Sequence, residues 1–331
     1  MRKKKSFFQT LLSLPLRYKI TIPYLLVASI LVGLAAYQVG RTFSSTLEEQ
    51  FRGQLASASL RTNEAVVDLE ESHLTVLRSL NFTQGVPQAI ADQNIQALSD
   101  LLYPQILNNY PYYIDVLDPT GQPLITWHRS SMRLDYQDDP FANYPQWSVV
   151  KRLLAREQDE RGRVFSGIEE TSQGLALYTG RPVLVEDAFV GVLLVGTPLD
   201  QVILRLETAS MAHIRLYTPQ GVLASSTLGD VEDGQLSDST SEAIRKNPDV
   251  LPTRQLYSGE NGYIEAVGPF YLRGAPTEWY VGVVLGEELV RKAQRPILWR
   301  MLPIFGVGIL AMVGLGVIVA QLIAKPVFRL V

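Results

Sequence analysis

The sequence contains no cysteine, and this absence excludes several kinds of site at once. Without cysteine the chain has no disulfide, no thiolate ligand for a metal ion and no thiol nucleophile. A folded domain must therefore be stabilised by its own hydrophobic core. A chain of 331 residues, of which 47% are hydrophobic, is long and apolar enough to build one.

Motifs of catalysis and of cofactor binding are also missing. No Gly-x-Ser-x-Gly elbow, Gly-x-Gly-x-x-Gly turn or phosphate loop occurs. The three histidines, His73, His128 and His213, are far apart in sequence and have no carboxylate at metal-ligand spacing. We therefore expect no catalytic site, no metal and no cofactor in this chain, although a kinase or cyclase output domain could follow residue 331.

Charge is missing from two long runs, Ile20 to Gly40 and Met301 to Ala324. A helix of about 20 apolar residues spans a hydrocarbon core of about 30 Å. We therefore predict transmembrane helices over residues 20–40 and 297–324. A cleaved signal peptide is the alternative for the first run, but its apolar stretch is longer than the usual signal core.

Acidic residues are missing from both ends of the chain. Residues 1–19 and 325–331 hold 8 of the 30 basic residues, so the middle keeps 22 of them with all 33 acids, a net charge of −11. Basic flanks stay in the cytoplasm. This predicts a multi-pass protein of the cell (inner or plasma) membrane with an extracytoplasmic central domain. The acidic middle also argues against nucleic acid as a partner.

Residues 41–80 have a helical apolar periodicity and contain no proline. A helix of this length suits a stalk, and its apolar stripe is wide enough to pack against another helix. We therefore predict a parallel homodimer through the stalk, with Phe43, Leu47, Phe51 and Leu55 as candidate contacts. The alternative is a long surface helix packed on its own domain.

One sequence segment, which we call the repeated phrase, occurs twice in the middle of the chain. Residues Ile114 to Thr126 align with Ile214 to Ser225, so that both copies place a Pro-x-Gly turn between two β-rich segments. A second pair of similar segments, which we call the second echo, aligns residues 190–196 with 281–286. Each copy ends in a helical run. The order of these features predicts two similar modules, each a hairpin, a helical insertion and a closing antiparallel set of strands.

A stalk helix followed by two such modules resembles the double Cache domain of bacterial receptors, over roughly residues 41 to 295. The resemblance implies an α+β fold, a tandem PAS-like (double Cache) domain with a long N-terminal stalk helix, flanked by the two transmembrane helices. Residues Ala324 to Val331 look like the start of a HAMP signal-relay helix. The expected division is a cytoplasmic tail (1–19), a first span (20–40), a stalk (41–80), a membrane-distal module (81–209), a membrane-proximal module (210–295), a second span (297–324) and a HAMP-like segment (325–331).

In this family the distal module usually binds a small ligand, often an amino acid, another carboxylate or an amine. The resemblance places its pocket around residues 127–147 and 165–181. Arg129 could clamp a carboxylate through two parallel hydrogen bonds or pair with a nearby aspartate. The aromatic candidates could wall the pocket or belong to the core. The candidate ligand-binding residues are Trp127, Arg129, Tyr144, Trp147, Tyr178, Arg181 and Asp187.

The function that follows is a receptor that senses a small molecule and relays a conformational change through the second span to a cytoplasmic output. That output could be a histidine kinase, a nucleotide cyclase or a chemoreceptor-type coiled coil. A membrane-anchored binding or adhesion protein that does not signal is the main alternative. An exterior hydrolase is a third, although the sequence offers no clustered nucleophile and base.

Overall fold

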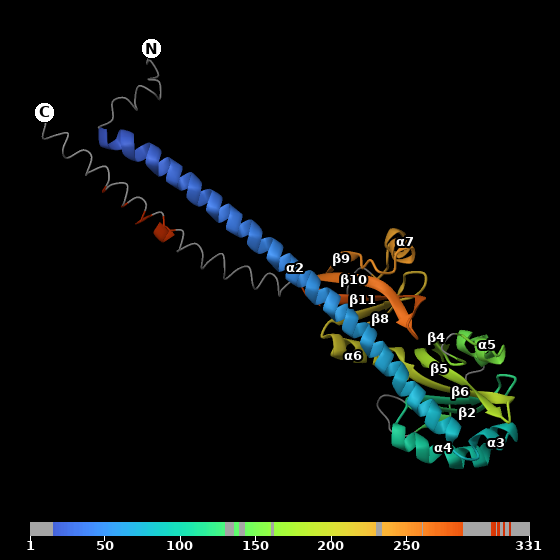
Figure 1. Cartoon of the computed structure of the whole chain (residues 1–331). Coiled ribbons are helices and arrows are strands. Elements are labelled where there is room, and N and C mark those ends of the chain that lie inside the picture. The colour runs from blue at the N-terminus through green and yellow to red at the C-terminus, as the bar shows by residue number, and fades with distance from the viewer. Residues whose placement is uncertain are drawn as a thin grey trace, which may run out of the picture. The chain divides into compact units, whose positions relative to one another are not determined.

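The computed structural model describes residues 16–129, 136–138, 143–159, 162–229, 234–259 and 261–286, and a few helical residues between 306 and 318. The chain divides into two units. One comprises Met1–Gln54 with Glu287–Val331, and the other comprises Leu55–Gly286. The second unit contains both sheets and is drawn with its labelled elements in Figure 1. The HAMP-like segment 325–331 lies outside the described residues.

The prediction of two transmembrane helices is wrong. Among the described residues, no helix combines the length and the apolarity that a membrane crossing needs. The predicted multi-pass location in the cell membrane is corrected with it. The prediction counted missing charges, but an uncharged run is not a uniformly apolar one, since residues 20–40 include Thr21, Ser29 and Gln38. They belong to one continuous helix, α2 (Leu16–Phe82). Most of the second run lies outside the described residues.

The first sheet contains the first copy of the repeated phrase. Its six strands lie in the order β3-β2-β1-β6-β5-β4, and every neighbouring pair is antiparallel. We call this sheet and the elements that cover it the distal module. Its strands are β1 (Tyr113–Leu117), β2 (Pro123–His128), β3 (Gln137–Asp138), β4 (Phe165–Thr171), β5 (Gly174–Val185) and β6 (Ala188–Pro198).

The second sheet contains the second copy. Its five strands lie in the order β8-β7-β11-β10-β9, again antiparallel. We call this sheet, together with the helix α7 (Asp238–Lys246) that covers one of its faces, the proximal module. Its strands are β7 (His213–Tyr217), β8 (Leu223–Ser226), β9 (Thr253–Ser258), β10 (Asn261–Leu272) and β11 (Ala275–Gly286). The α+β double fold is thereby confirmed.

The repeated Pro-x-Gly turn has the same structure in both modules. Gly121 and Gly221 both have positive φ angles, of 85° and 77°, which glycine adopts without steric cost. In the distal turn the Gly121 amide donates to the carbonyl of Asp118, and in the proximal turn the Gly221 amide donates to that of Thr218. Both hairpins also shift register at the same place, before Leu117 in β1 and before Tyr217 in β7.

Each sheet has two covered faces. Within the second unit, α2 runs along one face of both sheets, as Figure 1 shows. Two short helices, α3 (Val86–Ala91) and α4 (Ile95–Asn109), complete that layer of the distal module. The opposite face is covered by α5 (Ser148–Leu154) in the distal module and by α7 (Asp238–Lys246) in the proximal one. Helix α6 (Leu199–Ser210) connects β6 to β7.

Candidate functional site

A polar group is buried in the centre of the distal module, under η1 (Tyr144–Gln146) and α5. Asp115 is fully buried in the middle of β1, where the alternation of the strand turns it toward α5. Its Oδ1 accepts two hydrogen bonds, from His128 Nε2 at 2.9 Å and from the Tyr144 hydroxyl at 2.9 Å. Its Oδ2 is buried and finds no hydrogen-bond partner among the described residues. A carboxylate oxygen left in this condition is costly, because burial removes the water that would otherwise solvate it.

Aromatic rings surround this carboxylate. The Trp147 ring lies 4.6 Å from the Tyr144 ring and 4.7 Å from the Tyr178 ring, measured between centroids. The centroid of the Tyr113 ring lies 4.2 Å from that of the His128 imidazole, and the two rings are tilted by 32°. We call Asp115, His128 and the four aromatic residues the Asp115 cluster.

The hydroxyl of Tyr178 lies 3.4 Å from His128 Nε2, next to the buried carboxylate. Burial, followed by the charge of Asp115, raises the pKa of Tyr178 well above its usual value, so the phenol stays protonated. The absence of a side chain at Gly196 leaves space for this ring. A Cβ on Gly196 would come within 2.6 Å of the Tyr178 ring.

The helix over the cluster is held by a second buried carboxylate. Glu169 of β4 accepts hydrogen bonds from the Ser148 hydroxyl at 2.7 Å and from the Val149 amide at 2.9 Å, at the start of α5. Burial raises the pKa of Glu169, partly offset by these bonds. The start of α5 is thus fixed to the sheet, which positions Trp147 above Tyr178.

The structure brings together three of the seven residues that the sequence analysis selected: Tyr144, Trp147 and Tyr178. Trp127 lies on the other face of the sheet, with its ring edge-on to that of Tyr103 in α4. Arg129 bonds to the carbonyls of Tyr110 and Pro111 and lies over a tyrosine ring, so it braces the segment between α4 and β1.

The remaining two residues are also outside the cluster. Arg181 faces the end of α2, 5.6 Å from the Phe82 ring, and burial lowers its pKa. Asp187 is exposed in the turn between β5 and β6.

Asp115 and His128 were missed by the sequence analysis. His128 was interpreted as a histidine without a carboxylate partner, because Asp115 is thirteen positions away in the sequence. Antiparallel pairing of β1 with β2 closes that distance, since Tyr113 is opposite His128 and Asp115 is opposite Thr126. The signal that could have found the site was a charged residue in the middle of a strand that is otherwise apolar.

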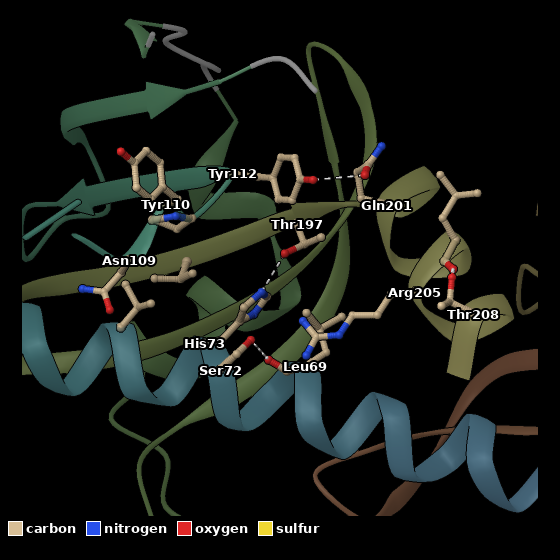
Figure 2. A pocket seen from close by; sticks show the side chains of 14 residues that line it. Leu69, Ser72, His73, Asn109, Tyr110, Tyr112, Thr197, Gln201, Arg205 and Thr208 are labelled. Atoms are coloured by element: carbon tan, nitrogen blue, oxygen red, sulfur yellow. Dashed lines mark hydrogen bonds between the residues drawn. The ribbon is translucent and has the colours of Figure 1, made fainter. Parts of the chain in front are cut away.

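A second hollow lies on the α2 side of the distal sheet, drawn in Figure 2. It is a cleft of about 450 Å³ between α2, the segment joining α4 to β1, and α6. His73 of α2 forms its base and bonds through both ring nitrogens, to Thr179 at 3.1 Å and to Thr197 at 2.8 Å. Burial lowers the pKa of His73 to about 3, so the imidazole is neutral. We call this hollow the His73 cleft.

Comparison with known proteins agrees with the architecture. A family model described as the double sensory domain of two-component sensor kinases matches residues 48–279. No protein of curated function matches the chain.

Several solved structures of sensory domains are similar to this chain. The ligand-binding domain of the Campylobacter jejuni chemoreceptor Tlp3 in complex with L-norvaline is 11% identical, with a TM-score of 0.50 over 75% of this chain and 95% of that one. A domain of a sensory box/GGDEF family protein from Vibrio parahaemolyticus is 16% identical, with a TM-score of 0.49 over 74% and 97% of the two chains. The extracellular domain of a histidine kinase is also 16% identical, with a TM-score of 0.49 over 77% and 96%. At 11% identity, the likeness to the Tlp3 domain shows a shared fold alone.

Proposed function

Because the chain belongs to the family of double sensory domains of two-component sensor kinases, we propose that it senses a small molecule that carries an amine. We place the ligand at the Asp115 cluster of the distal module. Occupation of that site would change the conformation of the domain and so control an output module such as a histidine kinase.

The buried Oδ2 of Asp115 is the observation that carries the proposal. A carboxylate oxygen that finds no hydrogen-bond donor among the described residues is suited to one supplied by a ligand. An ammonium group adds a charge to that donor, and charge-assisted hydrogen bonds are about twice as strong as neutral ones.

The walls of the cluster favour the same ligand class. Aromatic faces attract cations, and Tyr113, Tyr144, Trp147 and Tyr178 lie around the carboxylate. Among the described residues, Asp115 accepts hydrogen bonds from His128 and Tyr144, and no arginine or lysine donates to it. The site therefore offers an anion for an amine and no cation for a carboxylate, which favours a simple amine over an amino acid.

The connection between the modules supports a signalling role. Strand β6, which packs on the cluster through Val192 and Leu194, continues directly into α6 and then into β7. A ligand that prefers one conformation of the distal module shifts the equilibrium by its differential affinity for that conformation. The rigid path from β6 through α6 would carry such a shift to the proximal module.

Thermal unfolding of the full chain with simple probes tests the proposal. Propylamine, 1,4-diaminobutane and tetramethylammonium represent cations, L-norvaline represents amino acids, and propionate represents carboxylates. We expect one of the cations to stabilise the protein by about 2.7 kcal/mol at 100 times its dissociation constant. We expect Asp115→Asn to remove that effect, because the amide carries no charge.

Asp187→Asn is the matched control. It removes the same charge from an exposed turn of the same module. We expect this variant to respond to the cation as the wild type does. Loss of the response in Asp187→Asn and its retention in Asp115→Asn would overturn the proposal, as would stabilisation by propionate alone.

A further inference from the structure

The His73 cleft and the Asp115 cluster lie on opposite faces of the distal sheet. The cleft is bounded by α2 on one side and by α6 on the other, so its two walls belong to different helices. Figure 2 shows Arg205 extending from α6 toward α2, above Leu69 and Ser72. An occupant would therefore contact both the long helix and the helix that joins the two modules.

The charge that the described residues bring to the cleft is positive. Among its described lining residues Arg205 is the only charged side chain, and no aspartate or glutamate lines it. Arg205 is exposed and makes no hydrogen bond or ion pair with another described residue. The neutral His73 adds no charge to the base. The cleft thus presents an uncompensated cation to any ligand that enters.

A second polar side chain, that of Gln201, lines the same cleft. The Tyr112 hydroxyl donates to Oε1 of Gln201 at 3.0 Å, as the dashed line in Figure 2 shows. This bond uses the oxygen of the amide and leaves its NH₂ group as a donor, one helical turn before Arg205. In Figure 2 the amide nitrogen of Gln201 is turned away from Arg205, so rotation of the Gln201 side chain would be needed for the amide and the guanidinium to bind the two oxygens of one carboxylate together.

The remaining walls combine apolar side chains with the polar side chains of Ser72, Asn109, Thr197 and Thr208. Leu69 and Val76 of α2, Val195 of β6 and Leu204 of α6 line the cleft beside the polar groups. A volume of about 450 Å³ is within the range of small-molecule sites. Sites of this kind usually combine mostly apolar walls with a few polar groups that fix the orientation of the ligand.

From this geometry we propose that the His73 cleft is a second binding site, for a small organic carboxylate with an apolar body. Arg205 and Gln201 bind the carboxylate, and the side chains of Leu69, Val76 and Leu204 contact the apolar part. The site is independent of the amine site in position, charge and ligand class. Its ligand holds α6 to α2 and thereby acts on the same connection between the modules.

Calorimetry on the full chain with benzoate and hexanoate as probes tests this proposal. We expect saturable binding of at least one probe with a dissociation constant in the range of about 0.1 to 1 mM. Arg205→Ala should weaken that binding at least about tenfold, because a charge-assisted bond is lost. Gln201→Glu should weaken it too, because it places an anion beside the ligand.

Two controls keep the result specific. Arg61→Ala removes an exposed arginine from α2, outside the cleft, and should leave benzoate binding unchanged. Asp115→Asn should also leave it unchanged, which separates this site from the amine site. Circular dichroism checks that each variant is folded.

The proposal is overturned if neither probe shows saturable binding up to about 10 mM, or if Arg205→Ala binds as tightly as the wild type. Loss of benzoate binding in Asp115→Asn, with retention in Arg205→Ala, would assign the carboxylate to the other face of the sheet and would equally reject the His73 cleft.

Discussion

The distal and proximal modules place different chemistry at equivalent positions of the same fold. The strand pairings define the equivalence, because Ile114 is opposite Val195 in the distal sheet and Ile214 is opposite Val283 in the proximal one. Asp115 in β1 then corresponds to Arg215 in β7. By the same alignment Tyr178 in β5, which is opposite Gly196, corresponds to Glu265 in β10, which is opposite Val284.

The proximal positions form a network within the protein itself. Glu265 is fully buried, and its Oε2 lies 2.6 Å from Arg254 Nε and 3.6 Å from Arg215 Nη1. The Tyr217 hydroxyl donates to Glu265 Oε1 at 2.6 Å and accepts from Arg254 Nη2 at 2.8 Å. Burial and the neighbouring carboxylate raise the pKa of Tyr217, so it remains a donor. Both oxygens of Glu265 have donors.

The distal positions lack the matching cations. Gly167 of β4 is opposite Tyr178, as Arg254 of β9 is opposite Glu265, so a glycine replaces the proximal arginine. A Cβ at Gly167 would come within 2.9 Å of Val149 in α5, which explains the glycine by the close approach of that helix. One fold can therefore complete its buried charges or leave one for a ligand, and the residues at the site decide which.

Of the substitutions considered, removal of Glu265 should lower the free energy of unfolding most. Glu265→Ala leaves Arg215 and Arg254 without their shared carboxylate, and breaking a buried ion pair in this way costs about 3–5 kcal/mol. Urea unfolding of the full chain measures the loss. Glu242→Ala breaks an exposed ion pair with Lys246 in α7, and it should change stability by at most about 1 kcal/mol.

A small loss of stability in Glu265→Ala would weaken the contrast between the modules. If the free energy of unfolding fell by no more than in Glu242→Ala, the proximal network would contribute little. The proximal positions would then be as open to a ligand as the distal ones.

The general architecture could be predicted from the sequence because it depends on local signals. The Pro-x-Gly turns, at Pro119 and at Pro219, fixed two hairpins, and their repetition indicated two modules. The domain boundaries, the homodimer and the identity of the output stay predictions. Phe43 and Leu47 have side chains outside the described part of the chain, and Phe51 and Leu55 are buried in the single chain rather than displayed for a partner.

The second echo was aligned incorrectly. Residues 190–196 were aligned with 281–286, which equates Gly191 with Gly282, but the strand pairing equates Leu194 with Gly282. The shift is three residues, an odd number, so the echo paired side chains on opposite faces of the sheet. Similar letters on two strands do not fix the register, which depends on the neighbouring strand.

The site could be predicted only in part for the same reason. Tyr144, Trp147 and Tyr178 were found because large aromatics near a suspected pocket are conspicuous. Asp115 and His128 meet through strand pairing, which no short motif records. Charged residues at the same place in both copies, Asp115 and Arg215, were a usable signal that the repeat alignment already contained.

The other faces of the two sheets differ as well, and this difference predicts a pH effect. His73 bonds to Thr179 and Thr197, whose proximal equivalents are the apolar Ala266 and Leu285. The pKa of His73 falls from 6.5 to about 3 because burial disfavours the imidazolium. The folded state therefore binds a proton less readily than the unfolded state.

This difference in proton binding sets the direction in which stability changes with pH. The contribution of His73 to stability is complete above pH 6.5 and is lost as the pH falls from 6.5 toward 3. Between pH 7 and about pH 5 the loss should be about 2 kcal/mol. His73→Gln cannot take up the proton, so its urea unfolding should lack this part of the pH dependence. Identical slopes for the variant and the wild type would contradict a buried neutral histidine.

The smallest predicted effect compares two hydroxyls. Tyr217→Phe removes a hydroxyl that donates to Glu265 and accepts from Arg254, so both charged groups lose a partner. Tyr144→Phe removes a donor to Asp115 Oδ1, which keeps its hydrogen bond from His128. Charge-assisted bonds contribute about 1.5–3 kcal/mol, so Tyr217→Phe should cost about 1 kcal/mol more than Tyr144→Phe.

Parallel urea unfolding curves of the two variants measure this difference. Tyr257→Phe is the control, because the Tyr257 hydroxyl is exposed and bonds to the exposed Gln255, so its loss should change stability little. If Tyr144→Phe costs as much as Tyr217→Phe, the distal carboxylate depends on its own protein donors as fully as the proximal one does. Asp115 would then be a structural residue, and a ligand amine would have nothing to complete.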